Sequence, residues 1–170
     1  LPCGTTSSNE NFPADAFTWY TANGAANAHA GTRYLRIDRN SNNTTAKDDW
    51  FYSAPMNLTG GKLYRIYFWH RIGAVGSENF EIFLSNSNDA ATMLTTSALF
   101  NGASNLMTYK LDSSADILPP FTGVYYYGIH ANGAANGQSL FMDDIQVKQI
   151  PVAAMDPASC ITVPSLYDQL

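Results

Sequence analysis

The sequence of 170 residues has little charge, and positive charge is especially scarce. Charged residues make up 14% of the chain, against about 25% in an average soluble domain. Lys and Arg number 9 and Asp and Glu number 14, which gives a net charge of −5. A protein that follows the phosphates of a nucleic acid needs a basic patch, and the sequence contains none. We therefore expect no nucleic-acid partner.

Long hydrophobic runs and long amphipathic helices are missing as well. No apolar run approaches the ~20 residues that cross a bilayer, and the segment from Leu63 to Trp69 is interrupted by Arg65. We therefore expect no membrane insertion. The first residue is Leu, so we expect the chain to be part of a longer precursor.

Cysteine is scarce too, with Cys3 and Cys160 lying 157 positions apart. In a secreted sandwich whose termini meet, this pair can form a disulfide that closes almost the whole chain. The chain-entropy model gives such a loop on the order of 5 kcal/mol of stabilisation. Alternatively, Cys160 belongs to a following module and pairs elsewhere or not at all. Spacing alone does not decide between these two interpretations.

The sequence is rich in short segments of aromatic and β-branched residues that alternate with polar ones between Asn-Gly and Gly-Gly turns. This pattern predicts an all-β fold, an antiparallel β-sandwich of the jelly-roll type, over residues 1–150. Residues 151–170 contain three prolines and no alternation, which is typical of a linker or the start of a following module. The predicted strands include Phe17–Tyr20, Tyr34–Asp38, Trp50–Ser53, Leu63–His70, Phe80–Ser85, Leu106–Leu111, Val124–His130 and Leu140–Ile150.

The alternation also assigns side chains to faces of the sheets. It predicts a core row of Tyr64, Ile66 and Phe68 and a second of Phe80, Ile82 and Leu84. Exposed rings among Asn, Gln and Thr are typical of a sugar-binding surface, although any single ring is more simply explained by packing. The predicted carbohydrate-binding residues on the outward face are Tyr67, Trp69 and Phe83.

Signatures of catalysis are absent. The histidines His29, His70 and His130 show no metal-ligand spacing. Glu78 and Glu81 are three positions apart on a strand, so they point to opposite faces and do not form the facing pair of a glycosidase. We therefore predict that the chain is not an enzyme. A hydrolase with dispersed catalytic groups is the less favoured alternative.

Calcium is the better chemical hypothesis. The alternation places Asp143 on the inward face of its strand, in a row with Phe141, Ile145 and Val147. A buried carboxylate without a partner is costly, and a hard cation or a set of backbone amides would offset that cost. The alternative is a hydrogen-bonded acid without a metal.

Five motifs, in order along the chain, resemble those of the cleaved-adhesin and choice-of-anchor J domains, which are related to MAM domains. The resemblance covers roughly residues 9–149. The first motif, DDWFYSAPMNLTGG at Asp48–Gly61, resembles the block DDWL-x-SP-x-x-L-x-GG. The other four motifs are Tyr64–Arg71, Asn79–Ser85, Tyr126–His130 and Leu140–Val147.

The resemblance implies a jelly-roll, non-catalytic binding module of a larger secreted or cell-surface protein. Its expected partner is a polysaccharide or surface glycan. The alternatives are an adhesin that binds a host or matrix protein, or a structural spacer. The resemblance also implies a structural calcium ion held by Glu10 and Asp143, with backbone oxygens near Gly31 and Thr32 completing the set of ligands. The segment Ala158–Cys160 resembles the start of a fibronectin-type module.

Overall fold

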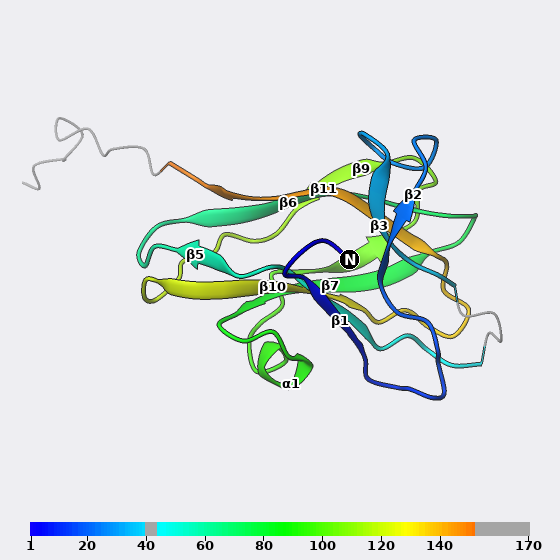
Figure 1. The fold of residues 1–170 in the computed structure, drawn as a ribbon, viewed down its shortest axis with the longest axis horizontal. Coiled ribbons are helices and arrows are strands. Elements are labelled where there is room, and N and C mark those ends of the chain that lie inside the picture. The colour runs from blue at the N-terminus through cyan, green and yellow to red at the C-terminus, as the bar shows by residue number, and fades with distance from the viewer. Residues whose placement is uncertain (40–43, 152–170) are drawn as a thin grey trace, which may run out of the picture.

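The computed structural model describes residues 1–39 and 44–151, which form two antiparallel sheets packed face to face (Figure 1). This is a jelly-roll β-sandwich, and the predicted fold class is confirmed. The first sheet has the order β1 (Thr6–Asn9), β4 (Asp49–Tyr52), β10 (Gly123–Ala131), β7 (Glu78–Ser85) and β8 (Phe100–Ser104), with β5 (Met56–Leu58) also paired to β10. The second has the order β2 (Tyr20–Asn23), β3 (Arg33–Ile37), β11 (Leu140–Gln149), β6 (Tyr64–Ile72) and β9 (Lys110–Ser113).

The main core lies between the sheets and follows the predicted alternation along β6 and β7. Ile66 and Phe68 of β6 are fully buried against Phe80 and Ile82 of β7. The outward residues of β6, including Trp69, are half-buried. The period-two pattern therefore assigned both faces of β6 correctly.

A second, smaller cluster lies on the outer face of the first sheet. The short helix α1 (Ala90–Met93), which follows β7, places Met93 over Trp50, Tyr52 and Phe83. Phe83 is consequently only 4% exposed. The prediction of an exposed Phe83 is wrong because alternation identifies an outer face but cannot show that a connecting segment covers it.

Strand β11 contains a β-bulge that reverses its alternation. Asp143 pairs with Trp69, and the next paired residues are Gln146 and Tyr67, so β11 has one extra residue between them. Asp144 takes the left-handed backbone conformation there, with φ of 47°.

The bulge changes which β11 side chains face the core. Leu140 and Met142 before the bulge belong to the core, and Ile145 and Val147 after it pack against the core. Asp143 therefore lies on the outer face of its sheet. Asp143 and Phe141 share one face, but that face is the outer one. The predicted inward row of Phe141, Asp143, Ile145 and Val147 is wrong, because the extra residue after Asp143 moves Ile145 and Val147 to the opposite face.

No helix in the described ranges is long and apolar enough to cross a membrane.

Candidate functional site

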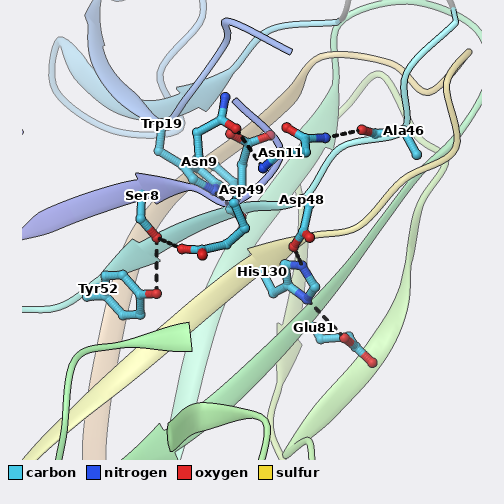
Figure 2. Close-up of polar contacts among 11 residues, drawn as sticks. Ser8, Asn9, Asn11, Trp19, Ala46, Asp48, Asp49, Tyr52, Glu81 and His130 are labelled. Carbon is cyan, nitrogen blue, oxygen red and sulfur yellow. Dashed lines mark hydrogen bonds and ion pairs between the residues drawn. The ribbon is translucent and has the colours of Figure 1, made fainter. Parts of the chain in front are cut away.

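A polar cluster closes the end of the sandwich where β1 ends and β4 begins (Figure 2). Asn9, the last residue of β1, pairs with Asp49, the first residue of β4. The chain then crosses this end of the sandwich, and the Asn9 side-chain Nδ2 donates to the carbonyl oxygens of Asp15 at 2.8 Å and Phe17 at 2.7 Å. Trp19 Nε1 donates to the carbonyl of Asp49 at 3.1 Å. These bonds enclose the acidic side chains of the segment.

Four buried side-chain oxygens in this cluster have no hydrogen-bond partner among the described residues. They are both carboxylate oxygens of Asp49, Oδ2 of Asp15 and Oδ1 of Asn11. Asp49 is 0% exposed and Asp15 is 1% exposed. A buried polar atom without a partner costs about 1–3 kcal/mol, and more when it is charged. The cluster therefore lacks a group that would bind these oxygens.

The pKa of Asp49 also shows that its negative charge is poorly stabilised in this cluster. Burial, and next the charge of Asp15, raise the pKa of Asp49 to about 7. Asn11 belongs to the same cluster, since its backbone N–H donates to Asn9 Oδ1 and its Nδ2 donates to the carbonyl of Ala46 (Figure 2). Two carboxylates and an amide oxygen are ligands that a hard cation prefers.

The structure does not bring together the calcium ligands implied by the resemblance. Glu10 accepts a hydrogen bond from Ser8 Oγ at 2.6 Å, and the same hydroxyl lies 3.2 Å from the Tyr52 hydroxyl on the outer side of the first sheet. Asp143 lies on the outer face of the other sheet, so the sandwich separates it from Glu10. The exposed Gly31 and Thr32 belong to the β2–β3 connection. The predicted set is therefore incorrect as one site.

Asp143 has partners of its own. Its Oδ2 accepts from the backbone N–H groups of His29 at 2.8 Å and Ala30 at 3.3 Å, and its Oδ1 accepts from that of Asp144 at 2.8 Å. Asp143 is therefore a hydrogen-bonded acid, with backbone donors to both of its carboxylate oxygens.

Trp69 and Tyr67 lie on the outer face of the second sheet, as predicted, but Trp69 is covered by the β2–β3 connection. The imidazole of His29 stacks on its indole with ring centroids 3.8 Å apart and an interplanar angle of 17°. Asp144 Oδ2 lies 2.7 Å from His29 Nδ1. Arg71 Nη2 donates to Asn27 Oδ1 at 2.8 Å and fixes the same connection.

The three predicted carbohydrate-binding residues do not form one surface. Tyr67 and Trp69 belong to β6 in the second sheet, whereas Phe83 belongs to β7 in the first. The outer faces of the two sheets point away from each other, and Phe83 is covered by α1. Only Tyr67 and Trp69 remain as a pair on one face.

His130 connects three strands beside the polar cluster. Its Nε2 lies 2.8 Å from Asp48 Oδ1 and its Nδ1 lies 3.3 Å from Glu81 Oε2 (Figure 2). Its ring stacks on Trp50 at 4.2 Å. This bridge joins β10 to β7 and to the residue before β4, which fixes the position of the neighbouring Asp49.

No family model matches the sequence, and no curated protein matches it. Among solved structures, the K1 cleaved adhesin domain of Lys-gingipain from Porphyromonas gingivalis is 14% identical, with a TM-score of 0.69 over 89% of this chain and 94% of that one. This chain has the fold of the cleaved adhesin domains.

Carbohydrate-binding modules share the fold too. A family 61 module in complex with β-1,4-galactotriose is 15% identical, with a TM-score of 0.56 over 87% of this chain and 90% of that one. The xylan-binding family 22 module of Paenibacillus barcinonensis Xyn10C is 7% identical, with a TM-score of 0.54 over 88% of each chain. At these identities the likeness concerns the fold.

Proposed function

We propose that this chain is a non-catalytic, extracellular binding module of a larger secreted or surface protein. It binds a polysaccharide or surface glycan through the outer face of the second sheet and holds a structural calcium ion at the polar end. The observation that carries the binding role is the outward pair of Tyr67 and Trp69. The shared fold with modules solved with galactotriose or described as xylan-binding supports it.

The contact between His29 and Trp69 defines how a sugar enters. A flat ring stacked on the indole at 3.8 Å is the arrangement that the C–H face of a pyranose takes on an aromatic residue. His29 therefore occupies the stacking position, and a sugar displaces it. The connection that carries His29 includes Gly24 and Gly31, both at positive φ, so it has backbone freedom near both ends.

Retention on soluble xylan and β-1,4-galactan in affinity gels tests this role. We expect Trp69→Ala to weaken binding about tenfold, which corresponds to about 1.4 kcal/mol. His29→Ala should strengthen binding, because the stacking position is then free. Val124→Ala, an exposed apolar residue of the first sheet, serves as the matched control. Failure of the unaltered chain to bind any glycan in a broad panel would contradict the glycan role.

The calcium ion is proposed at Asp15, Asp49 and Asn11, because these residues carry the unpartnered oxygens. The described residues contain no group of three or more His, Cys, Asp or Glu side chains that could hold a metal. Carbonyl oxygens and water would complete the six to eight ligands that calcium takes. Bound there, the ion would supply the positive charge that the two carboxylates lack.

Thermal unfolding in EDTA and in excess Ca²⁺ tests the metal. A ligand at one hundred times its Kd stabilises by about 2.7 kcal/mol, so we expect the Tm to rise by about 5–10 °C. Asp49→Asn should abolish the rise. An identical Tm in both buffers would contradict the proposed calcium site.

A protein-binding adhesin is the second candidate function, and the likeness to cleaved adhesin domains favours it. Binding to immobilised matrix proteins that survives both Trp69→Ala and His29→Ala would support this candidate over the glycan role.

A further inference from the structure

A cleft of about 640 Å³ opens into the side of the sandwich. It exists because β3 pairs with β11 only at residues 140–142, so the second sheet splits beyond the bulge in β11. One wall consists of residues of β2 and β3, and the other of Phe51, residues 53–56 and Tyr127 of the first sheet. Ligand sites typically have volumes of about 300–1,000 Å³. The cleft therefore has room for a small molecule.

The floor of the cleft is apolar. Leu35, Phe51 and Met142 line it and belong to the main core. Met56 and Ile145 line it as well and are only partly buried. Covering these side chains releases the water in contact with them, which is favourable for an apolar ligand. The floor therefore favours a ligand with an apolar body.

The hydroxyl of Tyr127 is a polar group within this apolar wall. The Tyr127 ring packs against the core, with its centroid 6.2 Å from that of Phe51. Burial raises the pKa of Tyr127, and its hydroxyl has no hydrogen-bond partner among residues 1–39 and 44–151. A purely aliphatic ligand would leave this hydroxyl unpaired, which is costly. A ligand with a hydroxyl group of its own would pair with it.

The wall formed by β2 and β3 supplies hydrogen-bond donors. Arg33 is two residues before the core residue Leu35, so its side chain leaves the same face of β3, towards the cleft. Asn23, the last residue of β2, pairs with Arg33 and lines the cleft beside it. No described residue forms an ion pair with Arg33. A guanidinium with an amide beside it is suited to a carboxylate.

Two acids on the rim restrict where an anionic group can lie. Asp143 and Asp144 line the cleft at the bulge. The oxygens of Asp143 accept from backbone N–H groups, and Asp144 Oδ2 lies 2.7 Å from His29 Nδ1. These bonds stabilise both acids as carboxylates, which repel an anion. A carboxylate in the cleft therefore lies at the wall that carries Arg33.

Residues 1–5 form another part of the rim, and Cys3 is exposed there. Cys160 and the predicted linker or following module lie outside the described residues 1–39 and 44–151, so the Cys3–Cys160 disulfide stays a prediction. Neither cysteine takes part in the site.

We propose that the cleft binds a small carboxylic acid that has an apolar body and a hydroxyl group at the end opposite the carboxylate. The carboxylate binds Arg33 and Asn23, the body covers Leu35 and Phe51, and the hydroxyl group reaches Tyr127. The outer face that carries Trp69 and the polar end that carries Asp49 are separate from these residues. The site therefore does not depend on glycan or calcium binding.

An NMR titration of the full chain with para-hydroxyphenylpropanoate provides the first test. We expect amide shifts in β2, β3 and residues 51–56, with a Kd of about 1 mM or below for a ligand of this size. Xylohexaose should leave these amides unshifted. Their failure to shift at several times that concentration of the acid would overturn the proposal. Shifts of the same amides by xylohexaose would assign the cleft to a sugar and overturn it too.

Variants test the two polar ends separately. We expect Arg33→Met to weaken binding of the acid about tenfold and to leave binding of the alcohol para-hydroxyphenylpropanol unchanged. Lys62→Met removes the same charge outside the cleft and should change neither. Tyr127→Phe should weaken binding of the hydroxylated acid about fivefold without weakening that of phenylpropanoate.

Each comparison sets two ligands against each other on one variant, so a loss of folded protein cannot produce the expected pattern. Equal losses for the acid and the alcohol in Arg33→Met would overturn the proposed carboxylate position. Equal losses for the two acids in Tyr127→Phe would overturn the proposed role of the hydroxyl group.

Discussion

Two buried carboxylates of this sandwich, Glu78 and Asp49, differ in the partners that surround them. Glu78 is 1% exposed, and Lys47 Nζ lies 2.7 Å from its Oε2 while also donating to the carbonyl of Gln138 at 2.8 Å. Asp49 is 0% exposed, and neither of its carboxylate oxygens has a partner among the described residues. Lys47 therefore forms a direct ion pair with Glu78, whereas Asp49, only two positions after Lys47, interacts with its charge without forming an ion pair.

The pKa values sharpen this difference. Burial raises the pKa of both carboxyls to about 7. The ammonium of Lys47 opposes the rise in pKa at both carboxyls, but only at Asp49 does a neighbouring carboxylate, that of Asp15, add to it. The loop beyond β10 also closes tightly on Glu78, since a Cβ on Gly133 or Gly137 would collide with its carboxylate. Glu78 therefore has an ion pair at Oε2 and leaves only Oε1 without a hydrogen-bond partner, whereas both carboxylate oxygens of Asp49 are without one among the described residues.

Removing the counter-charge of Glu78 should have the largest effect. We expect Lys47→Met to lower the free energy of unfolding by about 3–5 kcal/mol, because it leaves a buried charge unpaired. Urea unfolding at pH 7 measures the change. The exposed Lys62→Met is the control, and we expect it to stay within about 0.5 kcal/mol of the unaltered chain. Equal effects of the two variants would show that the Lys47–Glu78 pair contributes nothing special.

Local periodicity explains why part of the fold could be predicted from the sequence. The alternation along β6 identified Ile66 and Phe68 as core and Trp69 as outward, because a regular strand keeps its period of two. Strand β1, by contrast, has the polar sequence TSSN. It forms because it pairs with β4. This contact is non-local, so the composition of β1 does not predict it.

The candidate site was harder to predict for the same reason. Asp49 is two residues before Phe51 and therefore shares the core-facing side of β4. Its neighbour Asp15 comes from a segment without periodicity, and only the tertiary structure brings the two together. Asp143 was misplaced by a single extra residue in β11, and a bulge leaves no clear mark in one sequence.

The second prediction concerns the pH dependence of stability without metal. The pKa of Asp49 is about 7 in the folded chain and 3.8 in its ordinary state, so between about pH 4 and pH 7 the folded chain binds more protons. Stability contributed by Asp49 is therefore fully present below pH 3.8 and is lost as the pH rises towards 7. Glu78 adds a slope of the same sign.

Asp49→Asn isolates the part of the slope that belongs to Asp49. In EDTA we expect this variant to lose less stability between pH 4 and pH 7 and to exceed the unaltered chain by about 1–3 kcal/mol at pH 7. In Ca²⁺ the order should reverse, because only the unaltered chain gains from the ion. Urea titrations across this pH range measure both. Parallel curves for the two proteins in EDTA would contradict an unpartnered Asp49.

The smallest effect is expected at Asp143, the acid whose partners are already present. In Asp143→Asn the amide oxygen can still accept from His29 and Ala30, but Nδ2 would face the N–H of Asp144, donor against donor. We expect a loss of about 1 kcal/mol in urea unfolding, the value of one hydrogen bond. The increase of the Tm with Ca²⁺ should stay unchanged, because backbone N–H groups already bind both oxygens of Asp143. If Asp143→Asn instead abolished the calcium response and Asp49→Asn preserved it, the ion would belong to the β11 bulge. The carboxylates of Asp15 and Asp49 would then have to coexist without a cation. The difference in partners between Asp49 and Glu78 would no longer indicate a calcium site.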